Sequence, residues 1–243
     1  MGRCRSYVMK VAILVAAIAT CCLKQMLSSA SSVQEPMKCE LEWFETDLEY
    51  LTSLSAREWH DTKGDNEYTI EWKRPNGSKW DLWRWTISNL NASVDAVWQE
   101  FTTDALLVDS KRWTSQYVEK SGKSVYVSEN LKLIYMQFNS GVAPLISNRD
   151  LCYVQCTRPI GSATRLASYR SVKNNSFCPE VKGFERLTWW GANLFVDQGN
   201  NMTKLVLIDQ EDQGGNIPES LYDRFMARTY LRKEVEAIIR FFR

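Results

Sequence analysis

The segment PLISNRDLCYV, residues 144–154, passes from a loop bounded by Pro, Ser and Asn into a largely apolar stretch that continues to residue 157. A run of this length and composition is typical of a buried β-strand. Arg149 and Asp150 form a charge pair at the loop-to-strand junction, where they can orient the loop. Cys152 and Cys156 are four residues apart, so they share one face of the strand.

Similar strand-like segments lie on both sides of this one. Gly, Asn and Pro clusters separate most of them, and residues 74–77 read Arg-Pro-Asn-Gly, which is a hairpin turn signal. The expected strands cover residues 66–73, 79–88, 113–119, 123–128, 131–138, 150–157, 164–172, 184–196 and 203–210.

Three helices are expected between and around these strands. Residues 39–55 are acidic and bear leucines, and residues 94–101 have helical apolar spacing behind Ser93, a suitable N-cap. The strongest pattern is at 218–243, where Tyr222, Met226 and Tyr230 recur every four residues and Leu231, Val235, Ile238 and Phe242 continue the apolar stripe. The order of elements predicts an α+β fold with a curved antiparallel sheet covered by the final helix.

Composition limits the classes of function. The chain has 243 residues, 44% of them hydrophobic, and its ten Trp suit a large core, a lined cavity or a membrane-facing edge. Thirty basic and 29 acidic residues give a net charge of +1 without a long basic run. This balance argues against a nucleic-acid partner, but it is compatible with a local basic patch for anionic lipid head groups.

The N-terminal segment looks like a targeting signal. Residues 1–34 contain no acid, and basic residues precede an apolar run at 11–23, which Ser28 and Ala30 follow. This arrangement predicts a secretory signal peptide within residues 1–30, and the apolar run is too short to span a bilayer. We therefore expect a secreted protein or one in the secretory pathway. A membrane anchor and a mitochondrial presequence are the alternatives.

Removal of residues 1–30 leaves an even number of cysteines, which fits an oxidising compartment. They allow three pairings, and a free, buried thiol is equally compatible with Cys152 or Cys156. The remaining cysteines are Cys39, Cys152, Cys156 and Cys178. Four Asn-x-Ser/Thr sequons agree with secretion, at Asn76, Asn91, Asn174 and Asn201.

No catalytic or cofactor motif stands out. His60 is the only histidine, and its neighbours form no recognisable triad. The cysteines lack zinc-ligand spacing, and no Gly-rich phosphate loop is present. We expect a protein that is not an enzyme and that uses no metal and no cofactor.

Four segments, taken in order, resemble the START (StAR-related lipid-transfer) domain family. They are Arg112-Trp113, residues 144–154, residues 178–186 and residues 203–218. With the flanking helices the resemblance covers residues 37–243. The Gly-Gly-Asn-Ile-Pro form within the last segment is most similar to the phosphatidylcholine-transfer branch.

The resemblance implies a helix-grip fold, in which a curved antiparallel sheet wraps around the C-terminal helix and encloses a cavity for one lipid. It implies a monomer that binds a phospholipid, sterol or similar lipid and transfers it during transient contact with membranes. The C-terminal helix and adjacent loops would gate the cavity. A lipid sensor or protein-interaction module without transfer is one alternative, and a helix-grip enzyme is another.

The resemblance also implies lipid-contacting residues, each with an ordinary structural role as its alternative. Arg112 is a candidate for phosphate binding, and Trp190 lies where choline-binding members have an aromatic wall. Leu151, Met136 and Gln155 depart from the choline-binding or sterol-binding patterns, so the ligand class stays open. The full set is Arg112, Met136, Arg149, Leu151, Gln155, Arg186, Trp190, Tyr222, Met226, Val235 and Ile238.

Overall fold

A computed structural model describes residues 43–45, 47, 48, 51, 59–62, 66–104, 107, 119–138, 147–215, 217 and 228–243. The predicted targeting segment 1–30 and Cys39 lie outside these residues. Residues Leu41–Arg243 form one compact unit. Within the described part, no helix has both the length and the apolar character needed to cross a membrane.

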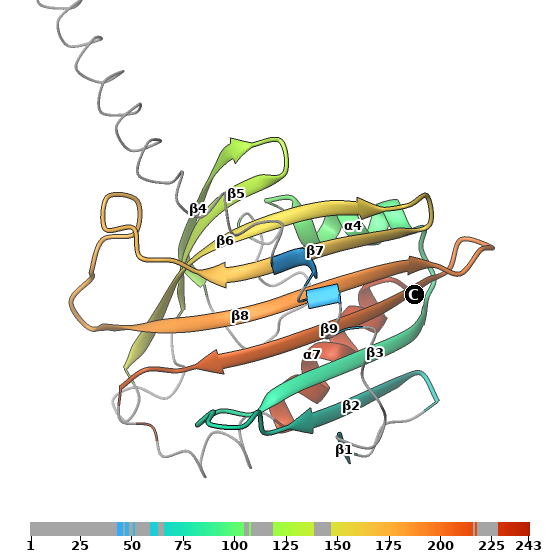
Figure 1. Cartoon of the computed structure of the whole chain (residues 1–243), viewed down its shortest axis with the longest axis horizontal. Coiled ribbons are helices and arrows are strands. Elements are labelled where there is room, and N and C mark those ends of the chain that lie inside the picture. The colour runs from blue at the N-terminus through green and yellow to red at the C-terminus, as the bar shows by residue number, and fades with distance from the viewer. Residues whose placement is uncertain are drawn as a thin grey trace, which may run out of the picture. The chain divides into compact units, whose positions relative to one another are not determined.

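The described strands form one nine-stranded sheet in the order β1-β2-β3-β9-β8-β7-β6-β5-β4 (Figure 1). Neighbouring strands are antiparallel, and the start of β6 also pairs in parallel with the start of β8. The strands are β1 (His60–Thr62), β2 (Tyr68–Lys73), β3 (Leu82–Leu90), β4 (Glu119–Ser128), β5 (Leu131–Phe138), β6 (Asn148–Ile160), β7 (Thr164–Ser171), β8 (Phe184–Asp197) and β9 (Thr203–Asp212).

Two helices cover one face of this sheet. Helix α4 (Val94–Thr102) begins at Ser93, whose hydroxyl accepts a hydrogen bond from the Ala96 amide at 3.2 Å, so the predicted N-cap is confirmed. Helix α7 (Arg228–Phe241) is the C-terminal helix, and the described part of it begins ten residues later than the expected start at 218. Helix α4 contacts β7 and β8, whereas α7 contacts β3. We call the covered face the inner face.

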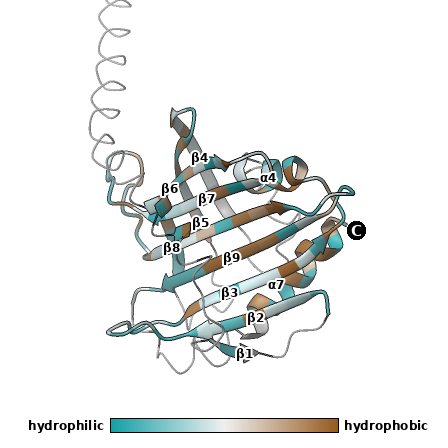
Figure 2. Cartoon of the chain, turned by 45° about the vertical axis from the view of Figure 1, so that its right-hand side comes forward, coloured by the Kyte–Doolittle hydropathy of each residue, from teal (hydrophilic) through white to brown (hydrophobic). Residues whose placement is uncertain are grey.

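Side chains alternate between the two faces along each strand. On β9, Leu205 and Leu207 join the inner core with Val235 and Ile238 of α7, while Ile208 is buried on the opposite, outer face. Figure 2 shows this apolar run along β9, with hydrophilic residues gathered at the hairpin turns. Because both faces of the central strands are buried, these strands show little alternation of polar and apolar residues.

The described helical residues at 43–51 contact the outer face. Asp47 is fully buried there and accepts hydrogen bonds from the guanidinium of Arg170 and the indole of Trp190. Arg170 also lies over the ring of Trp43, at 5.5 Å from the ring centroid. The described residues at 43–51 are helical, in agreement with the helix predicted at 39–55.

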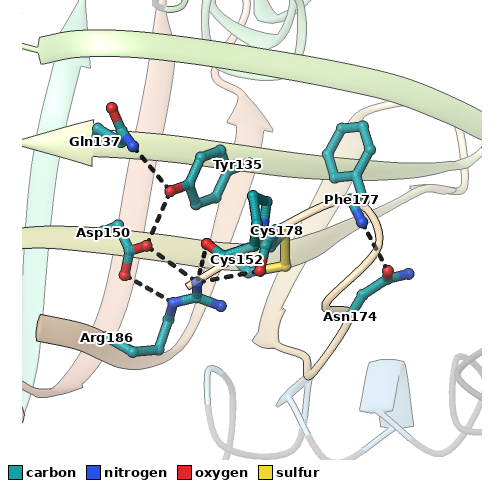
Figure 3. The surroundings of a disulfide bond; sticks show 9 residues. Tyr135, Gln137, Asp150, Cys152, Asn174, Phe177, Cys178 and Arg186 are labelled. Carbon is teal, nitrogen blue, oxygen red and sulfur yellow. Dashed lines mark hydrogen bonds and ion pairs between the residues drawn. A yellow bond between two sulfur atoms is a disulfide. The ribbon is translucent and has the colours of Figure 1, made fainter. Parts of the chain in front are cut away.

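A disulfide between Cys152 of β6 and Cys178 connects the sheet to the loop between β7 and β8. The two Cα atoms are 5.9 Å apart. Beside the disulfide, Asp150 pairs with Arg186 and accepts a hydrogen bond from the hydroxyl of Tyr135 (Figure 3). Cys156 is buried and forms no disulfide with a described residue. The Cys152–Cys178 bond is one of the pairings that the sequence left open.

Candidate functional site

A row of polar and aromatic side chains crosses the otherwise apolar inner face. Successive cross-strand pairs join Gln155 to Tyr169, Tyr169 to Gly191, Gly191 to Asp209 and Asp209 to Trp83. We call these residues, together with Trp189 and Glu234, the inner polar row. Its members come from β3, β6, β7, β8, β9 and α7, so the fold assembles it from segments far apart in the sequence.

Gly191 makes room for the indole of Trp189. A Cβ atom at position 191 would lie 3.2 Å from Trp189 Nε1 and 2.9 Å from the carbonyl oxygen of Ile208. Both distances are too short for a side chain to be added without movement. The missing Cβ therefore allows the Trp189 side chain to lie over its own strand and to donate a hydrogen bond to Asp209 Oδ1.

Trp189 belongs to a cluster of three aromatic rings. It stacks on Tyr169 with ring centroids 4.8 Å apart, and it meets the edge of Tyr153 at 5.0 Å. These two arrangements are the ones that aromatic quadrupoles favour. The cluster reaches the carboxyl group of Asp209 through the Nε1 edge of Trp189.

The hydroxyl of Tyr169 connects the cluster to two buried amide side chains. Asn193 Nδ2 donates to this hydroxyl at 3.0 Å, and Gln155 Nε2 donates to the carbonyl oxygen of Phe101 at 3.2 Å. Burial is the main cause that raises the pKa of Tyr169, so the phenol stays protonated. Gln155 Oε1 is buried and has no hydrogen-bond partner.

Two carboxyl groups, Asp209 of β9 and Glu234 of α7, lie at the interface between the sheet and the helix. Burial raises the pKa of Asp209, and repulsion from Glu211 and Glu234 adds to the effect. Burial and repulsion from Glu211 also raise the pKa of Glu234 to about 7. Each carboxylic side chain keeps some accessible surface even though the surrounding protein desolvates it.

Glu234 has no stabilising partner among the residues that the structure describes. It makes no hydrogen bond or ion pair with them, and its position places it on the same helical face as Leu231, Val235 and Ile238. Asp209 has the indole of Trp189 as its only donor in the same set. Buried carboxyl groups normally have charged or hydrogen-bonding partners.

Two buried indole N–H groups also lack a hydrogen-bond acceptor. Trp83 and Trp85 on β3 are 4% and 5% exposed, and neither Nε1 atom has a hydrogen-bond partner. Both residues belong to the inner core, and Trp83 is the cross-strand partner of Asp209. The inner face therefore carries unsatisfied donors and unsatisfied acceptors close to one another.

The structure places five of the predicted lipid-contacting residues on the inner face with this row. Leu151, Val235 and Ile238 are core residues, and Gln155 belongs to the row itself. Met136 is half-buried beside them, and its sulfur accepts a hydrogen bond from the Tyr153 hydroxyl at 3.5 Å.

Arg149 is buried at the start of β6, but its guanidinium is directed to the backbone. Its Nη1 donates to the carbonyl oxygens of Ser147 at 2.6 Å and Asn148 at 3.4 Å. These bonds fix the loop-to-strand junction, which is the structural alternative for this residue. They leave the expected lipid contact of Arg149 without support.

Arg186 and Trp190 lie on the outer face, away from the inner polar row. Arg186 pairs with Asp150 at 2.7 Å, and it also donates to the carbonyl oxygen of Cys178 at 3.2 Å (Figure 3). The indole of Trp190 donates to Asp47 at 3.2 Å, and Arg170 lies over its ring. A lipid contact by Arg186 or Trp190 does not fit this placement. Strand alternation puts Trp189, not Trp190, on the inner face.

The other three predicted residues, Arg112, Tyr222 and Met226, lie outside the described residues. Sequence reasoning missed Tyr169, Trp189, Asp209 and Glu234. Of these, Glu234 carried a usable signal, because it interrupts the apolar stripe of the last helix at helical spacing. The other three lie in strands with two buried faces, where no local pattern distinguishes inner from outer positions.

Comparison with known proteins identifies related folds. The family model described as START domain matches residues 87–233. Human StAR-related lipid transfer protein 5 has a similar structure, with a TM-score of 0.69 and 17% identity over 86% of this chain and 98% of that one. No individual curated protein matches the chain in sequence.

Two further solved structures show the same fold. Human STARD10 gives a TM-score of 0.67 with 14% identity, over 81% of this chain and 79% of that chain. A StAR-related lipid transfer protein fragment from Xanthomonas axonopodis gives 0.62 with 17% identity, over 75% and 97% respectively. The predicted α+β helix-grip fold is confirmed, whereas the expected likeness to the phosphatidylcholine-transfer branch is not.

Proposed function

Because the chain belongs to the START domain family, we propose that it binds one lipid molecule between the inner face of the sheet and helix α7 and carries it between membranes. Two proteins of similar structure are named as lipid transfer proteins. The specific lipid and the route of entry are part of this proposal. A monomeric state and only transient contact with membranes also belong to this proposal.

One observation carries the proposal: the inner face combines a large apolar surface with polar groups that the protein leaves without partners. An acyl chain or ring system gains roughly 0.8 kcal/mol for each methylene that it buries. An unsatisfied buried polar group costs about 1–3 kcal/mol. A lipid with an apolar body and one polar end would supply both the apolar contact and the missing hydrogen bonds.

We favour binding over catalysis on the chemistry of the same residues. Catalysis at a hydroxyl or thiol nucleophile normally needs a base in hydrogen-bond reach. His60 lies at the edge strand β1 and packs on Trp72 with ring centroids 4.5 Å apart. The inner polar row contains no Ser, Cys or His, so it suits recognition of a polar end group.

Helix α7 supplies the movable wall in this proposal. Its apolar face rests on the sheet through Leu231, Val235 and Ile238, while Glu234 sits unpartnered in the same face. A helix that buries a charged group gains less from closing than a fully apolar one. Outward movement of α7, together with adjacent loops, would let a lipid enter.

We also propose that the protein matures in an oxidising compartment, behind a signal peptide at residues 1–30. The Cys152–Cys178 disulfide supports this, since such bonds are rare in the cytosol. Thiol labelling of denatured protein without reductant tests it. Labelling of both Cys152 and Cys178 in protein from its natural source would contradict the proposal.

Native mass spectrometry of the purified protein tests the binding itself. We expect one lipid per chain, and Ile238→Asp should abolish its retention because Ile238 is 1% exposed in the inner core. Lys233→Asp on the exposed side of the same helix is the matched control. Retention must be compared on protein that circular dichroism shows to be folded. A folded wild-type protein that takes up no lipid from vesicles would refute the proposal.

Transfer requires a second measurement. Wild-type protein should move a fluorescent lipid from donor to acceptor vesicles faster than the spontaneous rate. Binding without any acceleration would support the alternative of a lipid sensor that makes protein contacts.

A further inference from the structure

The unsatisfied groups of the inner polar row are mainly acceptors. Glu234 has no donor, Asp209 has only the Trp189 indole, and Gln155 Oε1 is buried without a partner. All three lie on the inner face. A ligand that satisfies these acceptors must supply hydrogen-bond donors.

The cationic groups of the inner face are already engaged elsewhere. Lys132 Nζ donates to the carbonyl oxygen of Thr102 at 2.6 Å and pairs with Asp104 at 3.1 Å. Arg149 donates to backbone carbonyls of its own loop. Among the side chains that the structure describes, no Lys or Arg pairs with Asp209 or Glu234. A cationic ligand would supply the positive charge that the ionised forms of these two carboxyl groups lack.

The aromatic cluster favours the same kind of ligand. Trp189 contacts Asp209 through its indole N–H, Tyr153 and Tyr169 pack on Trp189, and aromatic faces attract cations by about 0.5–2 kcal/mol. Carboxylates next to aromatic faces suit an ammonium group. They disfavour a phosphate, which would meet like charge without a described basic partner.

The buried indole of Trp83 is an independent sign of a missing polar group. It is 4% exposed, lacks an acceptor and lies directly opposite Asp209 on the same face of the sheet. An ammonium group cannot accept its hydrogen bond, but a hydroxyl can. An amino alcohol therefore matches both sets of unsatisfied groups.

We propose that the ligand is a long-chain amine whose ammonium group binds between Asp209 and Glu234, beside the aromatic cluster of Tyr153, Tyr169 and Trp189, with an adjacent hydroxyl accepting from Trp83. This inference rests on the proposed lipid-binding function and specifies its polar end. A bound cation would favour the charged forms of Asp209 and Glu234 and so lower the pKa values that burial raises in the free protein.

Binding of five probes to the full-length protein tests the inference, each supplied in neutral vesicles or micelles. They are sphingosine, stearylamine, phosphatidylcholine, phosphatidic acid and cholesterol. We expect sphingosine to bind at least about tenfold more tightly than phosphatidic acid, since a charge-assisted hydrogen bond is worth roughly 1.5–3 kcal/mol. Stearylamine should bind less tightly than sphingosine because it lacks the hydroxyl.

Variants separate the carboxyl site from general lipid binding. The double variant Asp209→Asn, Glu234→Gln should lose about tenfold or more of its sphingosine affinity while cholesterol binding changes little. Glu236→Gln is the matched control on the same helix, since Glu236 pairs with the exposed Arg232. A folded protein that binds no probe would refute the lipid-binding function as well. Binding of phosphatidylcholine or phosphatidic acid as tight as sphingosine, or an unaffected double variant, would overturn only the amine assignment.

Discussion

Glu234→Gln removes an ionisable group from the interface between α7 and the sheet while keeping its size. Burial and the Glu211 carboxylate raise the pKa of Glu234 from 4.5 to about 7. At ~1.4 kcal/mol per pKa unit, this rise corresponds to a penalty of about 3 kcal/mol when the group is charged. Because Glu234 keeps some accessible surface, we expect a measured effect of about 1–3 kcal/mol.

The sign follows from proton linkage. A carboxyl whose pKa is raised on folding binds more protons in the folded state, so its penalty is complete above pH 7 and disappears as the pH falls toward 4.5. The lipid-free wild-type protein should therefore become more stable as the pH falls from 8 to 5, because the penalty for the charged form of Glu234 is lost. Asp209 and Glu211 of β9 face the same interface, and the raised pKa of Asp209 acts in the same direction.

Denaturant unfolding of lipid-free protein, followed by tryptophan fluorescence at pH 5, 6, 7 and 8, measures this effect. Glu234→Gln should be more stable than wild type at pH 8 and should show a weaker pH dependence. Glu236→Gln removes a half-buried charge that pairs with Arg232 on the same helix and accepts a hydrogen bond from Tyr68, and it should retain the wild-type pH slope. An unchanged slope in Glu234→Gln, or lower stability at pH 8, would refute the burial argument.

Two further changes test the sheet. Reducing the Cys152–Cys178 bond, which joins residues 26 positions apart, should cost about 3.5 kcal/mol of unfolding free energy by loop-closure entropy. An unfolding midpoint insensitive to reductant would contradict this. Gly191→Ala should cost about 1–3 kcal/mol and alter the near-ultraviolet dichroism of Trp189, because its Cβ would lie 2.9 Å from the Ile208 carbonyl oxygen. Wild-type stability and spectrum would show that the neighbours adjust freely.

The order of most elements was predictable because each carries a local signal. Strand β1 was not among the expected strands, and the strand expected at 113–119 lies outside the described residues except for Glu119. Ser93 marks the start of α4, and the Arg-Pro-Asn-Gly turn separates β2 from β3. The apolar stripe through Val235 and Ile238 likewise indicated a helix that covers the sheet. These signals depend only on residues within a few positions of one another.

The side-chain directions on β8 were not predictable in the same way. Trp189 and Trp190 are both half-buried. Trp189 packs against the inner core, whereas Trp190 lies on the outer face and donates to Asp47. A strand covered on both faces has no polar face to set the alternation. The expectation for Trp190 therefore relied on its distance from Arg186, which itself turned out to lie on the outer face.

The inner polar row lay beyond sequence reasoning for a related reason. Asp209 is acidic like its neighbours Glu211 and Asp212, and only the pairing of β9 with β3 and β8 puts it beside Trp83 and Gly191. Its significance comes from what surrounds it: an indole donor, aromatic faces and a second carboxyl group from α7. The site is built from five strands and one helix, so the residues that meet there depend on the strand register and on where the helix packs. Ligand chemistry in such a fold has to be argued from the partners that each buried group lacks.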